Sequence, residues 1–205
     1  MSDRGRLIAF EGGEACGKST QAAVLAERLG AVLTREPGGT PAGERVRALL
    51  LDAEVAGLDG RAEALLMAAA RAQHVAEVVG PALAAGRDVV SDRFSHSSLA
   101  YQGYGRGLDL AEVRRLSDWA TGGLWPDAVV LLHLPPGQAL TAPVAPDRFE
   151  SEARHFHERV AAGFRELAAG DPERWRVVDA AGSIEEVAAR VWSAVEPMLE
   201  REAAR

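Results

Sequence analysis

The stretch "EGGEACGKST" (11–20) constrains the fold more strongly than any other part of the sequence. Gly12 is followed by four residues and then by "GKS" (17–19), and the stretch lies between the apolar run 7–10 and the helix-like segment 18–29. This spacing, between a strand and a helix, is the pattern of a phosphate-binding loop. The backbone N–H groups of such a loop and the positive end of the helix that follows bind a polyphosphate. The sequence therefore predicts a nucleoside triphosphate site.

The side chains of the loop suggest how a triphosphate is held. We expect the Lys18 ammonium to contact the β- and γ-phosphates and the Ser19 hydroxyl to bind Mg²⁺ that bridges them. A Gly-rich turn without a ligand is the alternative interpretation. The residues expected to bind ATP are Gly12, Gly13, Glu14, Ala15, Cys16, Gly17, Lys18, Ser19 and Thr20.

Short β-branched runs alternate with longer segments rich in Ala and Leu along the whole chain. Most of these runs lack polar alternation, which is typical of strands buried on both faces. The pattern predicts an α/β fold, a doubly wound five-stranded parallel sheet flanked by helices, in a single domain over 1–205. We expect strands at 7–10, 31–34, 88–91, 128–134 and 175–180, and helices at 18–29, 41–51, 61–85, 110–121, 148–169 and 183–201.

Composition excludes several classes of protein. A net charge of −7 argues against a nucleic-acid binder, which needs a basic face. Cys16 is the only cysteine, so an intrachain disulfide is impossible, and the five histidines show no zinc-ligand spacing. The sequence has no apolar stretch of membrane length and no leader, so we expect a cytoplasmic protein with no membrane partner.

Arginines follow the predicted strands and lie within a predicted helix. In an open α/β sheet the carboxyl ends of the strands face one crevice, so we expect Arg35, Arg71 and Arg93 to converge on a second anionic group beside the triphosphate. The stretches that carry these arginines are "TREPGGT" (34–40), "AAARAQH" (68–74) and "SDRFSHSSLAYQGYGRG" (91–107).

Together with the loop, these stretches resemble the thymidylate kinase family of nucleoside monophosphate kinases. The similar segments cover nearly the whole chain and include "WPDAVVLL" (125–132) and "DRFESEARHFHERV" (147–160). The resemblance implies a homodimer that transfers the γ-phosphoryl group of ATP to dTMP, with a mobile lid at about 135–150. Two alternatives stay open: a nucleotide-binding regulator with weak or lost transfer, and a kinase for another pyrimidine monophosphate.

The resemblance also implies roles for individual residues. Glu14 accepts a hydrogen bond from the 3′-hydroxyl of dTMP, Arg93 holds the acceptor phosphate, and Asp92 holds Mg²⁺ through water. Tyr101 crowds the 2′ position of the sugar and so favours deoxyribose, although a packing role is the alternative. Structural ion pairs are the alternative for Asp92 and Arg93. The dTMP-binding residues implied are Glu14, Arg35, Arg47, Met67, Arg71, Arg93, Ser98, Tyr101 and Gln102.

Two features depart from the family pattern. Met67 occupies a position where the family stacks an aromatic ring on thymine, and the lid lacks the usual arginines. Between Gly137 and Glu150 the only cation is Arg148, so we expect Arg148 to act on the transferring phosphoryl group. A surface ion pair with Glu152 is the alternative. The expected catalytic residues are Lys18, Asp92, Arg93 and Arg148, and the expected Mg²⁺ ligands are Ser19 and Asp92.

Overall fold

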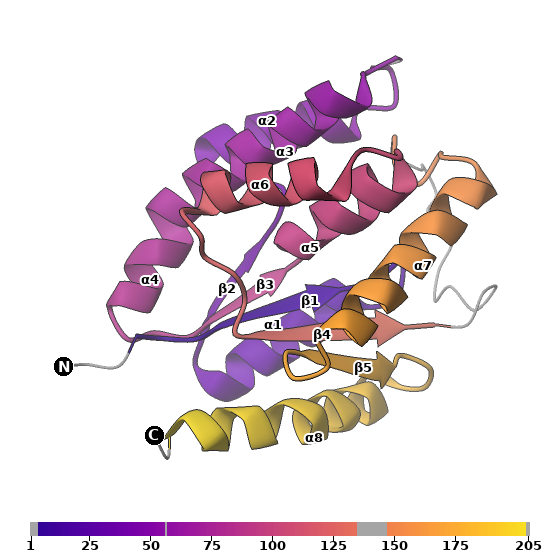
Figure 1. Cartoon of the computed structure of the whole chain (residues 1–205). Coiled ribbons are helices and arrows are strands. Elements are labelled where there is room, and N and C mark those ends of the chain that lie inside the picture. The colour runs from indigo at the N-terminus through magenta and orange to yellow at the C-terminus, as the bar shows by residue number, and fades with distance from the viewer. Residues whose placement is uncertain (1–3, 56, 135–146, 204–205) are drawn as a thin grey trace.

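Five parallel strands form one sheet in the computed structural model, which describes residues 4–55, 57–134 and 147–203. The strand order is β2-β3-β1-β4-β5, and Figure 1 shows helices on both sides of the sheet. All five predicted strands are confirmed to within one residue at either end. The strands are β1 (Leu7–Glu11), β2 (Val32–Arg35), β3 (Val89–Asp92), β4 (Ala128–His133) and β5 (Trp175–Asp179).

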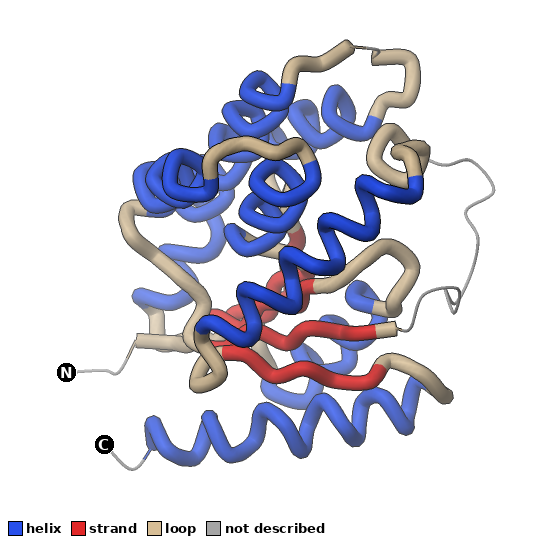
Figure 2. Tube along the Cα trace, turned by 45° about the vertical axis from the view of Figure 1, so that its right-hand side comes forward, coloured by secondary structure: helices blue, strands red, loops and turns tan. Residues whose placement is uncertain are grey.

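The helices follow the predicted pattern with two exceptions. The prediction for 61–85 is confirmed as one helical segment, α3, η1 and α4, of which η1 is a π-helical turn. The figures show the helices stacked on the strand layer (Figure 2). The helices are α1 (Lys18–Leu29), α2 (Pro41–Leu51), α3 (Gly60–His74), η1 (Val75–Val79), α4 (Gly80–Ala84), α5 (Ser95–Ser98), η2 (Leu99–Gly105), α6 (Leu110–Thr121), α7 (Arg154–Gly170) and α8 (Ile184–Ala203).

Local capping residues explain why α2 and α6 have the predicted bounds. The Thr40 hydroxyl accepts from the N–H of Gly43 at 3.0 Å, and Pro41 occupies the first turn, where its missing N–H costs nothing. The Asp109 carboxylate caps α6 in the same way, and Gly122 ends that helix in the left-handed conformation. These caps form between residues a few positions apart, which is why both helices keep the bounds expected from the local sequence pattern.

The first exception is the start of α7, which was predicted at residue 148. The Asp147 carboxylate instead accepts from the N–H groups of Phe149 and Glu150, at 2.8 and 2.9 Å, and forms a turn. The helix begins only at Arg154. The prediction was wrong for residues 148–153 because an aspartate can bind nearby backbone N–H groups outside a helix.

The second exception is the helical segment 95–105, formed by α5 and η2, which was not predicted as a helix. Its glycines allow close packing rather than ending the helix. A Cβ at Gly105 would lie 2.6 Å from the Phe156 ring, and a Cβ at Gly163 of α7 would lie 2.5 Å from Tyr104. Two helices can therefore approach each other closely at this point.

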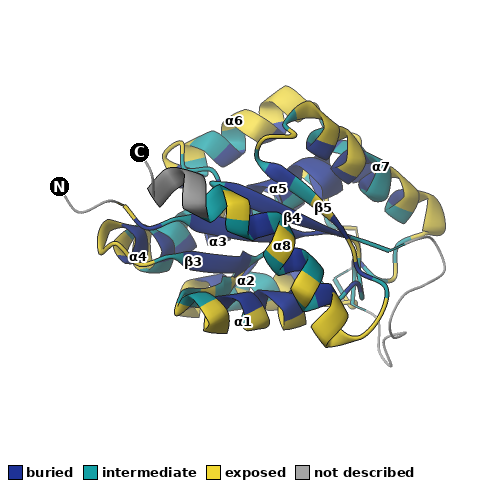
Figure 3. Cartoon of the chain, turned by 90° about the horizontal axis from the view of Figure 1, so that it is seen from below, coloured by how far each residue is buried: buried dark blue, intermediate teal, exposed yellow. Residues whose placement is uncertain are grey.

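The core lies on both faces of the sheet. Ile8 and Phe10 of β1 pack with α1 and α8, whereas Leu7 and Ala9 face the opposite side. The central strands β1 and β4 are buried almost throughout, and Figure 3 shows β3 and β4 in the colour of buried residues. The edge strand β2 alternates between half-buried and exposed residues. Among the described residues, none of the helices has the length and apolar character needed to cross a bilayer.

The sheet register aligns the chain segments that carry the predicted site. Phe10, Arg35 and Asp92 are level with one another across β1, β2 and β3. The phosphate-binding loop leaves β1 one residue later, after Glu11. The carboxyl ends of the three strands thus lie beside the loop, as expected for this type of sheet.

Candidate active site

The phosphate-binding loop joins β1 to α1 and depends on its glycines. Gly12 has φ 144° and Gly17 has φ 85°. A Cβ at Gly12 would lie 2.5 Å from the carbonyl oxygen of Leu132 on β4. Only glycine fits this approach, and residues 14–20 of the loop and of the start of α1 line a cavity of about 480 Å³.

Polar side chains of α1 and β3 meet at the floor of this cavity. Lys18 is 6% exposed, and its ammonium donates to the carbonyl oxygen of Gly13 at 2.5 Å. The Ser19 hydroxyl donates to Asp92 Oδ2, also at 2.5 Å. The other carboxylate oxygen of Asp92 is buried and has no hydrogen-bond partner among the described residues. A buried oxygen without a donor suits a cation or its bound water.

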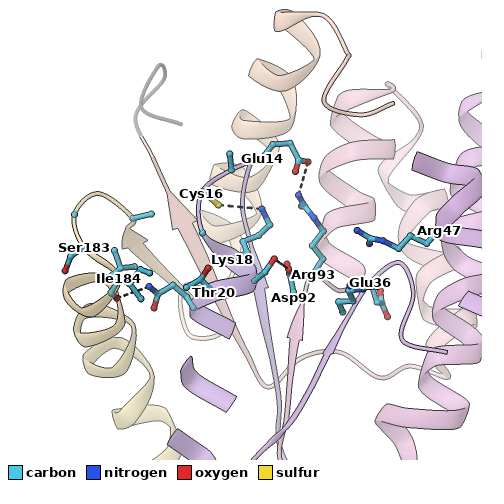
Figure 4. A pocket seen from close by; sticks show the side chains of 18 residues that line it. Glu14, Cys16, Lys18, Thr20, Glu36, Arg47, Asp92, Arg93, Ser183 and Ile184 are labelled. Atoms are coloured by element: carbon cyan, nitrogen blue, oxygen red, sulfur yellow. Dashed lines mark hydrogen bonds and ion pairs between the residues drawn. The ribbon is translucent and has the colours of Figure 1, made fainter. Parts of the chain in front are cut away.

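Arg93 connects the loop to the end of β3. It has φ 69°, an unusual backbone conformation for a residue other than glycine, and its N–H donates to the carbonyl oxygen of Phe10. Its guanidinium donates to the Gly12 carbonyl at 3.1 Å and pairs with Glu14 at 2.8 Å. Figure 4 shows the Glu14 and Arg93 side chains pointing toward each other across the cavity.

The electrostatics of Glu14 follow from these neighbours. Burial by itself favours the neutral carboxyl, but the positive charges of Arg93 and Lys18 and a hydrogen bond from Tyr101 outweigh it. The pKa of Glu14 falls from its ordinary value to about 2. Glu14 is therefore an anion at neutral pH and keeps Arg93 on the loop side of the cavity.

A second cavity lies next to the first. The two cavities share Glu14, Glu36, Arg47 and Arg93. The second cavity is lined by both apolar and polar side chains, which suits a flat heterocycle with polar edges. Its further lining includes Met67, Arg71, Phe94, Ser98, Tyr101 and Gln102.

Tyr101 is fixed at the boundary of the two cavities. Its hydroxyl donates to Glu14, and its ring makes edge contacts with Phe149, Phe156 and Phe164 at centroid distances of 5.8 to 6.2 Å. Both interpretations of Tyr101 from the sequence are therefore compatible with its position, because the ring packs in the core while the hydroxyl faces the cavity.

Known proteins share this architecture. The family model for thymidylate kinase matches residues 10–191. The chain belongs to the thymidylate kinase family. It is 53% identical to the thymidylate kinase of Synechococcus sp. (strain JA-2-3B'a(2-13)), over 94% of this chain and 95% of that protein. It is 49% identical to the thymidylate kinase of Desulfovibrio desulfuricans, over 95% and 97%. The crystal structure of thymidylate kinase from Ehrlichia chaffeensis has a TM-score of 0.79 and 32% identity, over 94% and 99%.

The predicted convergence of three arginines is only partly realised in this member of the thymidylate kinase family. Arg71 and Arg93 line the second cavity together, but Arg35 lines only the first, where it pairs with Glu44 at 3.0 Å. Arg47 instead lines both cavities, and its guanidinium donates to the carbonyl oxygen of Pro37 at 2.9 Å.

The position of Arg148 does not support a phosphoryl contact. Its side chain is 11% exposed, and its guanidinium pairs with the buried Glu63 at 2.7 Å and donates to the Leu50 carbonyl at 2.8 Å. It lines neither the first nor the second cavity. The alternative pairing with Glu152 is also absent, since Glu152 pairs with Arg106. Most of the expected lid, residues 135–146, lies outside the described residues.

Sequence reasoning missed Glu11, which ends β1. Its carboxylate is wholly buried and accepts from the N–H groups of Phe94 and Ser97, at 3.0 and 3.1 Å, and from the Ser97 hydroxyl. Burial raises the pKa of Glu11 to about 7, against the effect of these hydrogen bonds and of Arg93. The signal in the sequence was an acidic residue directly after the apolar run 7–10.

Proposed function

We propose that this protein is a dTMP kinase, which transfers the γ-phosphoryl group of ATP to dTMP and yields ADP and dTDP. The observation that carries the proposal is the pair of adjoining cavities that share Arg93. One cavity carries the phosphate-binding loop, and the other has the lining of a site for a base. Membership of the thymidylate kinase family supports dTMP as the acceptor.

The proposed reaction needs little from the protein beyond positioning and charge. An anionic oxygen of the acceptor phosphate attacks the γ-phosphorus of ATP and forms a new P–O bond, while the bond to the oxygen bridging the β- and γ-phosphorus breaks and its electrons leave with ADP. The attacking oxygen carries no proton, so a general base is unnecessary. Lys18 neutralises charge on the donor phosphates, and Arg93 holds the acceptor phosphate in line.

We assign Mg²⁺ binding to Ser19 and Asp92. The unpaired Oδ1 of Asp92 and the Ser19 hydroxyl supply two oxygen groups, which suits an ion that takes its remaining ligands from phosphates and water. When bound, Mg²⁺ neutralises charge on the phosphates. Among the described residues, no group of three or more His, Cys, Asp or Glu side chains is arranged to hold a metal ion.

The acceptor is expected in the second cavity. There, Arg71, Ser98 and Gln102 provide polar groups for the base, and Met67 provides an apolar surface. Glu14 is placed to accept from the 3′-hydroxyl of the sugar, and Arg47 to contact the monophosphate. We expect Arg35, which lines only the first cavity, to contact phosphate oxygens there.

Incubation with ATP, Mg²⁺ and each of dTMP, dUMP, dCMP, UMP and CMP tests the proposal. We expect ADP formation to be fastest with dTMP. The Lys18→Ala variant is the control: it is expected to lose transfer while calorimetry still detects dTMP binding. A wild-type protein that binds nucleotides without transferring a phosphoryl group would point to a regulator. Faster transfer to another of these nucleotides would show that it, and not dTMP, is the acceptor.

We further propose a cytoplasmic homodimer made of one domain per chain, 1–205. The single sheet supports one domain. Figure 1 shows the helices α2, α3 and α6 together on the side of the molecule away from α8. The apolar side chains that are exposed on these three helices support the dimer. They are Leu49, Leu65, Leu110 and Trp119. The net charge of −7 supports the absence of a nucleic-acid partner, and the nucleotide substrates support the cytoplasm.

A further inference from the structure

A buried chain of hydrogen bonds leads from the second cavity to the edge strand β2. Glu36 Oε2 accepts from Arg71 Nε at 2.7 Å, and Glu36 Oε1 accepts from His74 Nδ1 at 2.9 Å. The other ring nitrogen of His74 is 2.6 Å from the Thr34 hydroxyl. The side chains of Arg71, Glu36 and His74 are 3%, 4% and 0% exposed. The chain is thus shielded from water along most of its length.

The hydrogen bonds of Arg71 leave one nitrogen for a ligand. Nε donates to Glu36, and Nη2 donates to the Ser98 hydroxyl at 3.0 Å and to the Phe94 carbonyl at 3.4 Å. Within the described part of the chain, these are the three hydrogen bonds of Arg71, and none of them involves Nη1. Arg71 also lines the second cavity. Since the guanidinium is planar, fixing Nε and Nη2 also fixes the direction of Nη1.

Glu36 can fix Arg71 only if its own carboxylate is held, and His74 supplies that hold. A carboxylate only accepts, so His74 Nδ1 donates to Glu36, while Nε2 at the other end of the ring is hydrogen-bonded to the Thr34 hydroxyl. The glycine turn closes over this pair: a Cβ at Gly39, which has φ 77°, would lie 2.8 Å from the His74 ring and 2.9 Å from the Thr34 oxygen. Each end of the ring is therefore fixed.

We propose that Glu36 and His74 are positioning residues that aim Arg71 Nη1 at a carbonyl oxygen of a pyrimidine base. The inference rests on the proposed function, because it assumes that the base of the acceptor enters the second cavity. Thymine carries a carbonyl at ring position 4, where cytosine carries an amino group. A donor held in one direction favours the carbonyl, so these two residues contribute to selection of the base. His74 and Thr34 line neither described cavity and act only through Glu36.

The test compares binding of dTMP and dCMP to two variants that remove successive links. His74→Phe keeps a ring of similar size without nitrogens, and Thr34→Val removes one hydroxyl. We expect His74→Phe to weaken dTMP binding about tenfold and to lower the preference for dTMP over dCMP by a similar factor, as for one buried polar contact. The kcat with dTMP and the KM for ATP should stay within about threefold, because neither residue contacts the phosphates. Thr34→Val should shift the preference in the same direction by less.

A matched control is available in His96, the other buried histidine of the described core, which is 5% exposed. It packs between Trp125 and Trp175, with ring centroids 4.9 and 4.8 Å away, and lines neither cavity. His96→Phe is expected to keep the wild-type preference. His74→Asn retains an amide N–H donor toward Glu36. We expect this variant to keep more of the preference for dTMP over dCMP than His74→Phe does.

The outcomes separate this inference from the proposed function. If the wild type phosphorylates dTMP but His74→Phe and Thr34→Val keep its preference over dCMP, the inference is overturned and the function stands. Equal loss of affinity for both nucleotides also overturns it, since that marks a structural role. A wild type that neither binds nor phosphorylates dTMP overturns both. Where thermal unfolding shows that His74→Phe does not fold, Thr34→Val decides.

Discussion

At the scale of single residues, the site is organised by carboxylates that hold arginines and backbone groups in place. Glu14 holds Arg93, Glu36 holds Arg71, and Glu11 holds the N–H groups of Phe94 and Ser97. Each carboxylate is wholly or largely buried, so its protonation depends on the balance between desolvation and its partners. The partners dominate for Glu14, whose pKa is lowered to about 2, whereas burial dominates for Glu11, whose pKa is raised to about 7.

Glu11 should make the stability of the fold depend on pH. Its pKa is about 7 in the folded chain and has its ordinary value of 4.5 when exposed, so between these values the folded state binds the additional proton. The stabilisation present below pH 4.5 is lost as pH rises through 7. Glu11→Gln, which resembles the protonated form, should raise the free energy of unfolding at pH 8 by up to about 3 kcal/mol. Denaturant unfolding at pH 5 and pH 8 measures this, and an identical pH dependence in both proteins would contradict it.

Met67 should limit the affinity for the base. It lines the second cavity and packs against the cluster that contains Tyr101 and Phe149. Met67→Phe places a ring where the thioether lies, and stacking of a base on an aromatic ring is worth about 1–3 kcal/mol. We expect tighter dTMP binding in calorimetry, up to that range. Unchanged or weaker binding would show that residue 67 does not face the base.

At the scale of elements, one buried carboxylate joins three segments of the chain. Glu63 of α3 is wholly buried and pairs with Arg106, which follows η2, at 2.9 Å and with Arg148 of the turn before α7 at 2.7 Å. Gln102 of η2 also donates to it, at 2.8 Å. This cluster, Glu63, Gln102, Arg106 and Arg148, fastens the turn at residues 147–152 to the helices that line the second cavity.

Arg148→Ala should therefore act on stability more than on catalysis. The change leaves the Leu50 carbonyl without the Arg148 donor, while Arg106 and Gln102 still neutralise and bind Glu63. We expect the free energy of unfolding to fall by about 2 kcal/mol, the cost of an unsatisfied buried group. The kcat should stay within about threefold of wild type. Steady-state kinetics would restore a catalytic assignment if kcat fell a hundredfold while the unfolding midpoint stayed unchanged.

At the scale of the whole molecule, four of the eight large apolar side chains exposed among the described residues lie on the neighbouring helices α2, α3 and α6. Leu65 of α3 is 58% exposed and Trp119 of α6 is 84% exposed. Large apolar side chains exposed on neighbouring helices mark a surface for a partner, and a second copy is the commonest partner of a soluble enzyme. Neither residue lines the two described cavities, so the surface and the site are separate.

Leu65→Glu should shift the proposed homodimer toward monomers, because it places a charge in an apolar contact. Sedimentation velocity at several protein concentrations measures the shift. Val177→Glu is the matched control, since Val177 is 61% exposed on the edge strand β5, away from α2, α3 and α6. A wild type that sediments as a monomer, or an equal shift in both variants, would argue against this surface.

The sequence by itself determined the features that depend on near neighbours in the chain. The loop pattern at 11–20, the apolar runs of the five strands and the helices at 41–51 and 110–121 each involve residues a few positions apart. These features can be predicted without knowledge of the fold, because backbone geometry and hydrogen bonding over short separations follow from local residue types.

Only the tertiary structure decided which charged side chains meet. Arg148 pairs with Glu63, 85 positions earlier, and Glu36 pairs with His74, 38 positions later. Different folds of the same chain would place different carboxylates beside each of these arginines. Composition and spacing therefore do not identify the ion-pair partner of an arginine. The choice is made by burial, since a charge removed from water must take the partner that packing brings beside it.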